Sequence, residues 1–226
     1  MAVILISSPS DDTPKRYAQY FLRRYADSAS KQGHRVLFLS KPLLYNFENA
    51  VKKYNPDLVI VNGHGGSKGV TGLDAHVILG TKTYDKELRT KIIDENPELM
   101  KGRIVYLISC FSGKELAQSL IDHGATAVAG YRSALVFLTN EGRPIHADPL
   151  VKRYFTAILQ LPIMLAKGQS FGVGSQAVIR AFEKYRDEAE LSGENLEAKY
   201  HHFNMENFIS LGSRDATIWN VSSTRP

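Results

Sequence analysis

The chain has 226 residues, of which 43% are hydrophobic and 23% charged, a composition typical of a single globular domain. Its formal charge is +5, but the basic residues alternate with acidic ones along predicted helices, so we expect no nucleic-acid partner. The single cysteine excludes an intrachain disulfide and a cysteine zinc cluster, and it indicates a reducing, cytoplasmic setting.

The apolar stretches of the chain are too short for a membrane span. The first residues, Met1 to Ser8, carry no basic leader and predict a core strand rather than a signal peptide. The longest later stretch, Ala157 to Ala166, is interrupted by Gln160 and Pro162. We therefore expect a soluble protein with no membrane partner.

Short apolar, β-branched runs alternate with segments of helical period, which predicts an α/β fold with a mostly parallel central sheet. The predicted strands cover residues 3–7, 35–39, 58–62, 104–109 and 125–130. The predicted helices cover residues 13–31, 43–54, 84–95 and 114–123. The first of these helices is expected to start with Thr13 as its N-cap and Pro14 at its first position.

The pattern changes after Gly130. Residues 133–138 predict one more strand, and helical periodicity dominates residues 148–190. Residues 207–212 are expected to close a helix or turn, and residues 216–221 to add an edge strand. We expect one domain over residues 1–226, with a sheet core to about residue 138 and a mostly helical part over 145–212.

Two predicted strand ends carry reactive side chains. The strand over residues 58–62 runs into Gly63-His64-Gly65-Gly66, a loop too rich in glycine to be helical, which holds an imidazole. Because Gly65 has no side chain, its amide is unobstructed and is a candidate donor to an oxyanion.

The strand over residues 104–109 ends in Ser109-Cys110, directly before the helix expected from Lys114. A helix N-terminus there would favour the thiolate. A thiolate beside an imidazole can attack a carbonyl and then protonate the leaving amine. The Cys110 amide is a second candidate oxyanion donor.

Each of these residues has an ordinary structural interpretation when taken alone. A free cysteine is most often a small buried hydrophobe, and a lone loop histidine is most often a hydrogen-bonding residue. The pair is different, because a short βαβ path would make the two strands neighbours and bring both side chains to the crevice at their carboxyl ends.

These motifs resemble the caspase-hemoglobinase fold of cysteine peptidases, the clan of caspases, legumains, gingipains and CHAT-domain peptidases. One apolar strand is followed by His64-Gly65 and another by Ser109-Cys110. The spacing of the histidine and the cysteine, 110 − 64 = 46 residues, is close to the roughly 50 residues of caspases.

The residues after Cys110, Phe111 to Ala117 and Gly124 to Tyr131, are most similar to the gingipain and CHAT branch. The segment Asn207 to Ser213 also resembles a closing segment of gingipain-like proteins, although Ser213-Arg214 stands where Asp-Pro usually follows the glycine.

The resemblance implies a caspase-like three-layer α/β/α domain and endopeptidase chemistry by a Cys-His dyad. Cys110 would be the nucleophile, His64 the general acid and base, and the amides of Gly65 and Cys110 the oxyanion donors. It implies no required metal or organic cofactor. It leaves calcium activation open, although the chain has no run of carboxylates with the spacing of a calcium loop.

The resemblance also implies a strict preference for the residue before the scissile bond, set by a pocket beside the nucleophile. An acidic residue lines that pocket in gingipain-like members with a basic preference. The candidate substrate-binding residues here are Asp74, Asp148, Tyr131 and Ser133, of which the two aspartates serve equally well as caps or turn residues.

Asp11 and Asp12, after the first strand, are candidates to orient His64 or to form a turn before the first helix. His201 and His202 are adjacent, so they do not share one helix face as zinc ligands would, and we expect no metal site.

Two other functions remain alternatives to the peptidase. The glycine-rich loop, residues 62–69, would hold a phosphate or nucleotide in a flavodoxin-like binding module, with Cys110 as packing. A catalytically silent, peptidase-like interaction scaffold would keep the dyad behind a closed groove. The expected partner of an active enzyme is a peptide or protein substrate, with an activating or regulatory protein as a further partner.

Overall fold

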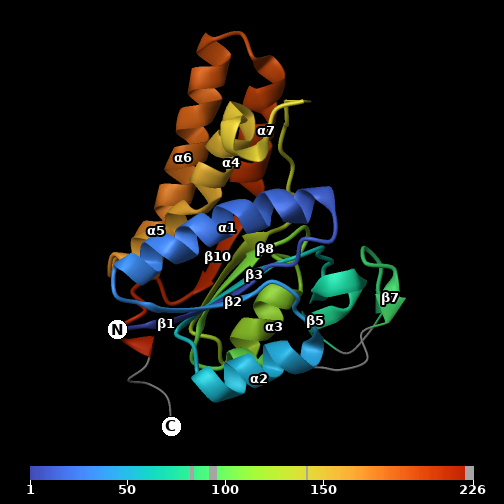
Figure 1. Cartoon of the computed structure of the whole chain (residues 1–226), viewed down its shortest axis with the longest axis vertical. Coiled ribbons are helices and arrows are strands. Elements are labelled where there is room, and N and C mark those ends of the chain that lie inside the picture. Colours follow the sequence, from blue (N-terminus) through green and yellow to red (C-terminus); the bar gives the residue numbers. More distant parts are fainter. Residues whose placement is uncertain (82–83, 92–95, 141, 222–226) are drawn as a thin grey trace.

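The computed structural model describes residues 1–81, 84–91, 96–140 and 142–221. Its centre is a six-stranded sheet in the order β10-β9-β8-β3-β1-β2 (Figure 1). The strands are β1 (Val3–Ser7), β2 (Arg35–Leu39), β3 (Leu58–Asn62), β8 (Ile104–Ile108), β9 (Ala127–Tyr131) and β10 (Phe208–Gly212). All neighbours pair in parallel except β10, which runs antiparallel to β9. The predicted α/β class with a mostly parallel sheet is confirmed.

Helices cover both faces of the sheet, so the central strands are buried on both sides and need continuous apolar sequence. On one face lie α1 (Thr13–Lys31), α4 (Pro149–Ile158), α5 (Gln160–Ala166) and α6 (Phe171–Leu191), and on the other lie α2 (Leu44–Tyr54) and α3 (Leu116–Asp122) (Figure 1). Successive strand residues divide between two core clusters. Ile4 and Ile6 pack in the core cluster that includes buried residues of α1, whereas Leu5 packs in the core cluster that includes buried residues of α2.

The sheet has a topological switch point between β1 and β3. The chain leaves β1 through α1 to reach β2 on one side, and then returns through α2 to β3 on the other side of β1. Because α1 and α2 cover opposite faces, a crevice opens at the carboxyl ends of β1 and β3, where open α/β sheets bind ligands.

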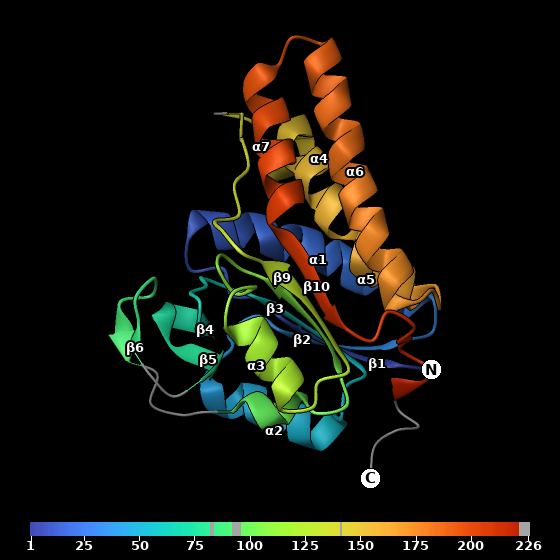
Figure 2. The same cartoon turned by 180° about the vertical axis from the view of Figure 1, so that it is seen from behind.

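The C-terminal part is helical, as expected, and α7 (Asn195–Asn207) runs directly into the edge strand β10. Figure 2 shows α6 and α7 as a pair that extends away from the sheet. Smaller elements connect the main ones: β4 (Gly69–Thr71), β5 (Val77–Gly80), β6 (Tyr84–Asp85), β7 (Thr90–Lys91) and the short 3-10 helices Leu73–Ala75, Pro97–Met100 and Ile145–Ala147.

The helix expected over residues 84–95 is wrong. Residues 84–91 form the hairpin β6–β7, and residues 92–95 lie outside the described residues. The buried carboxylate of Asp85 accepts hydrogen bonds from the amides of Glu87 and Leu88, which holds the chain in a turn. It also accepts one from the Lys68 amide, so the hairpin is attached to the loop after β3.

The strand expected over residues 133–138 is also wrong. The backbone groups of Leu135 and Val136 bond to side chains instead of to a neighbouring strand. The Val136 amide donates to the Asn204 side-chain oxygen at 3.2 Å, and the Asn204 side-chain amide donates to the Val136 carbonyl at 2.6 Å. The Leu135 amide donates to the sulfur of Cys110.

The edge strand lies at residues 208–212, where we expected a helix end or turn, and not at residues 216–221. In the latter segment, Ala216 and Ile218 are buried as in a strand, but the backbone turns. The carbonyls of Arg214 and Ala216 accept hydrogen bonds from the first amides of α6, at Gly172 and Phe171. The segment therefore caps a helix rather than extending the sheet.

The N-cap of α1 is Asp12 and not Thr13, because the Asp12 carboxylate accepts from the Lys15 amide. Asp148 caps α4 in the same way. Its carboxylate is fully buried and accepts hydrogen bonds from the amides of Leu150, Val151 and Asn140.

We expect Asp148→Ala to lower the free energy of unfolding by roughly 2 kcal/mol, because the buried Val151 amide and the partly buried amides of Asn140 and Leu150 would lose their acceptor. The exposed Asp27 on α1 is the control, since Asp27→Ala should change the stability by less than about 0.5 kcal/mol. Urea unfolding of both variants measures the difference. Equal stabilities would contradict the capping role.

Candidate active site

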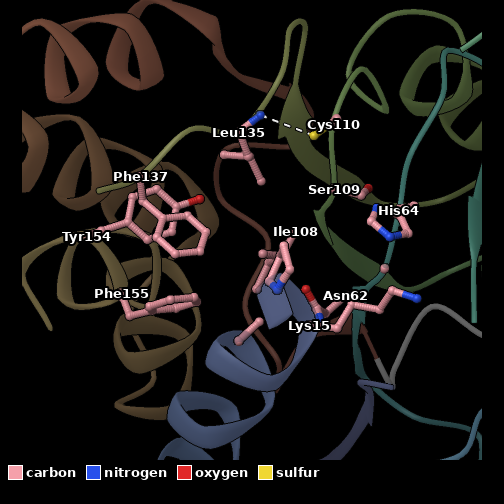
Figure 3. Close-up of a pocket in the computed structure, with 13 residues that line it drawn as sticks. Lys15, Asn62, His64, Ile108, Ser109, Cys110, Leu135, Phe137, Tyr154 and Phe155 are labelled. Atoms are coloured by element: carbon pink, nitrogen blue, oxygen red, sulfur yellow. Dashed lines mark hydrogen bonds between the residues drawn. The ribbon is translucent and has the colours of Figure 1, made fainter. Parts of the chain in front are cut away.

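The pairing of β3 with β8 brings the two reactive side chains to one pocket. The strands are parallel, with Asn62 opposite Ile108. His64 therefore follows one strand and Cys110 the next at the same edge of the sheet. Both line a single pocket, and Figure 3 shows them on neighbouring segments at its rim.

The backbone at Gly65 lies directly against that of Cys110. A Cβ atom at position 65 would overlap the Cys110 carbonyl oxygen, and it would lie 2.8 Å from the Cβ of Ser109 and 3.0 Å from the Cys110 nitrogen. Only glycine permits this approach. Within the part of the chain that the structure describes, neither the Gly65 amide nor the Cys110 amide donates a hydrogen bond to another residue. No other described residue thus occupies these two neighbouring amides, although the Cys110 amide interacts with the sulfur of its own side chain.

His64 is held by Asp12. Its Nε2 atom donates to Asp12 Oδ2 at 2.6 Å, which leaves Nδ1 as the ring nitrogen available to another group. Burial alone would raise the pKa of Asp12, but hydrogen bonds from Lys15 and His64 outweigh it, so this pKa lies below its usual value. The Lys15 ammonium also forms ion pairs with Asp11 at 2.8 Å and Asp12 at 3.1 Å. Asp12 therefore stays ionised and orients the imidazole while it caps α1.

Cys110 is half-buried, and its sulfur accepts a hydrogen bond from the Leu135 amide at 3.3 Å. Burial raises the pKa of the thiol, and the Leu135 amide offsets only part of that rise. The expected help from a helix N-terminus is absent, because residues 111–115 form turns and α3 begins at Leu116. The resting thiol is therefore protonated at neutral pH, and it needs a base for attack.

The glycine-rich loop has few free amides for a phosphate. The Gly66 amide donates to the Gly69 carbonyl, the Ser67 amide to Glu87 and the Lys68 amide to Asp85. The Ser67 and Lys114 side chains also donate to Glu87. The backbone amide of Glu87 itself, followed by these two side chains and the Ser67 amide, holds the pKa of Glu87 at about 2 against the opposing effect of burial. The carboxylates of Asp85 and Glu87 thus already accept the hydrogen bonds that the loop amides would give to a bound anion.

The candidate substrate-binding residues lie outside the pocket lining. Asp74 is exposed and its amide donates to Asp11, while the Asp148 carboxylate is used up as a helix cap. Tyr131 is fully buried, with its hydroxyl 3.0 Å from that of Tyr106. The Ser133 carbonyl accepts from the Phe111 amide, which supports the turn after Cys110.

Several lining residues were not singled out from the sequence. Lys15 reaches the pocket from α1, and the wall opposite the dyad is formed by Leu135, Phe137, Tyr154 and Phe155. Ser109 also lines the pocket, and its buried hydroxyl has no hydrogen-bond partner among the described residues. The Ser-Cys pair was visible in the sequence, but the wall joins two segments, residues 133–138 and α4, whose packing against the dyad the sequence pattern does not indicate.

The described residues contain no group of three or more His, Cys, Asp or Glu side chains that could hold a metal ion. Nor does this part of the chain include a helix long and apolar enough to cross a membrane. Comparison with known proteins finds no matching family model and no similar curated protein. The functional assignment therefore depends on the geometry of the site and on the resemblance of its motifs.

We expect the alkylation rate of Cys110 by iodoacetamide to rise about tenfold per pH unit from pH 6 to about pH 9, because only the thiolate reacts and its pKa is raised. Mass spectrometry reads the rate without ambiguity, since Cys110 is the only cysteine. A plateau already below pH 7 would contradict this, because it would reveal a thiolate in the resting protein.

Proposed function

We propose that the protein is a cysteine endopeptidase that hydrolyses peptide bonds through an acyl-enzyme, with Cys110 as nucleophile and His64 as general base and acid. The observation that carries this proposal is the shared pocket of the thiol and the imidazole, with Asp12 on the far nitrogen of the ring. A nucleophile, a base and a group that orients the base form the recurring unit of covalent hydrolysis. The resemblance of both motifs to caspase-hemoglobinase peptidases points the same way.

In the proposed reaction, His64 Nδ1 accepts the thiol proton as the sulfur attacks the carbonyl carbon of the peptide. The carbonyl oxygen takes up the negative charge and is bound by the amides of Gly65 and Cys110. When the C–N bond breaks, His64 returns the proton to the leaving amine. Water, deprotonated by His64, then cleaves the thioester and regenerates the thiol.

The charge arrangement favours this sequence of steps. Attack creates an imidazolium at His64, and the ionised Asp12 stabilises it through the hydrogen bond to Nε2. Lys15 keeps Asp12 ionised. The chemistry needs only groups of this chain and water. A reducing, cytoplasmic compartment fits a free thiol that is essential for activity.

A phosphate- or nucleotide-binding module has less support. Its loop would have to release Asp85 and Glu87 from the amides of Lys68 and Ser67 before an anion could bind there. Repulsion between an incoming phosphate and these carboxylates would oppose that exchange.

We expect Cys110→Ala and His64→Ala each to lower the hydrolysis of a quenched fluorescent peptide library by at least about 10³-fold. His146→Ala is the matched control, because this exposed histidine lies in the 3-10 helix Ile145–Ala147, away from the pocket. Thermal unfolding verifies that each variant folds. Wild-type turnover in either dyad variant would refute the proposal, and so would an inactive wild-type protein that leaves Cys110 unlabelled by every substrate-like warhead.

We expect Asp12→Asn to lower kcat by about 10²-fold or more while the protein stays folded. Asparagine caps a helix as well as aspartate does, so α1 is kept, but the charge that orients and stabilises the imidazolium is lost. Steady-state kinetics, with unfolding midpoints measured alongside, separates the two roles. An unchanged kcat would show that Asp12 serves only as the cap.

A further inference from the structure

The pocket beside Cys110 has apolar walls. Its lining brings together the first turns of α1, the end of β8, the segment over residues 133–138 and the middle of α4. The apolar side chains that line it are Pro14, Ala18, Ile108, Leu135, Phe137, Tyr154 and Phe155. Figure 3 shows Phe137, Tyr154 and Phe155 gathered opposite His64 and Cys110. A substrate side chain bound in this pocket would therefore contact mainly carbon atoms of the lining residues.

The charges at this pocket disfavour an ionised side chain. None of the described residues that line it is acidic, so a lysine or arginine side chain would be desolvated without an ionic partner. The lining does include Lys15, but its ammonium is already paired with Asp11 and Asp12. Both of these carboxylates lie outside the lining, so the pocket offers neither a basic nor an acidic side chain a free ionic partner among these groups.

The size of the pocket narrows the choice further. Its volume is about 70 Å³. This is about half of the ~150 Å³ of an apolar protein cavity that takes up benzene. An unbranched or γ-branched aliphatic side chain fits this space better than an aromatic ring does.

The walls are fixed in place before any ligand binds. Phe137 stacks on Tyr154 with ring centroids 4.9 Å apart and contacts Phe155 at 5.7 Å. Asn204 of α7 holds both backbone groups of Val136, the residue between Leu135 and Phe137. A preformed pocket binds without the cost of ordering its walls, so its shape discriminates between side chains.

We propose that this pocket receives the substrate side chain that precedes the scissile bond, and that it selects an aliphatic one, leucine or methionine. This inference rests on the proposed peptidase function. It assigns the choice of substrate to Leu135, Phe137 and Tyr154, whereas the resemblance directed attention to an acidic residue.

The test uses peptidyl acyloxymethyl ketones that differ only in the residue next to the warhead: Leu, Met, Phe, Arg or Asp. We expect the Leu and Met reagents to label Cys110 at least about tenfold faster than the Arg and Asp reagents, and labelling to disappear in His64→Ala. Equal or faster labelling by Arg or Asp would overturn the aliphatic preference and leave the peptidase standing. No His64-dependent adduct with any reagent would overturn the peptidase, and this inference with it.

A second variant tests the wall itself. Phe137→Ala enlarges the pocket, so the ratio of the Leu to the Phe labelling rate should fall by about tenfold. Phe203→Ala is the matched control, because this half-buried phenylalanine of α7 does not line the pocket. A ratio of two rates on one protein is insensitive to partial loss of stability. A ratio that stays at the wild-type value in Phe137→Ala would overturn the assignment.

Discussion

The parallel register between β3 and β8 is the constraint on which the candidate site depends. Because Asn62 lies opposite Ile108, the turns that follow these strands leave the sheet side by side. Their backbones touch at Gly65 and Cys110, where no side chain could be accommodated at position 65. The switch point between β1 and β3 then places Asp12 next to His64. Three short loops thus meet because of strand order alone.

The state of Cys110 follows from the same packing. The turn that presents the thiol also buries it, and burial favours the neutral form. A neutral thiol resists oxidation and nonspecific alkylation better than a thiolate would. In the reaction that we propose, the thiol proton passes to His64 only when a carbonyl is in reach and the negative charge moves to the oxyanion amides. Under that proposal, the reactivity of Cys110 is coupled to substrate binding.

Strands and loops could be predicted from the sequence where the local hydrophobic pattern and the tertiary packing favour the same element. Five strands, four of them largely buried, and the loops that carry His64 and Cys110 could be predicted, because continuous apolar runs and glycines leave few other structures open. The failures occurred where a side chain replaces a backbone partner. The Asp85 side chain holds a local turn where a helix was predicted, and the distant Asn204 takes the place of a neighbouring strand for Val136. Of the candidate pocket acids, Asp148 caps α4, and neither Asp74 nor Asp148 lines the pocket beside Cys110.

The helical C-terminal part contributes to the site as well as to the fold. Asn204 lies on α7, and the chain continues from this helix into β10, which pairs with β9 from Phe208 opposite Tyr131. The pairing at the sheet edge thereby fixes the position of α7. Asn204 of α7 in turn holds Val136, next to Leu135, whose amide donates to the Cys110 sulfur. A partner that shifted α7 would move the pocket wall and the sulfur's hydrogen-bond donor together. Regulation through the helical part would therefore act on substrate choice and on thiol reactivity at the same time.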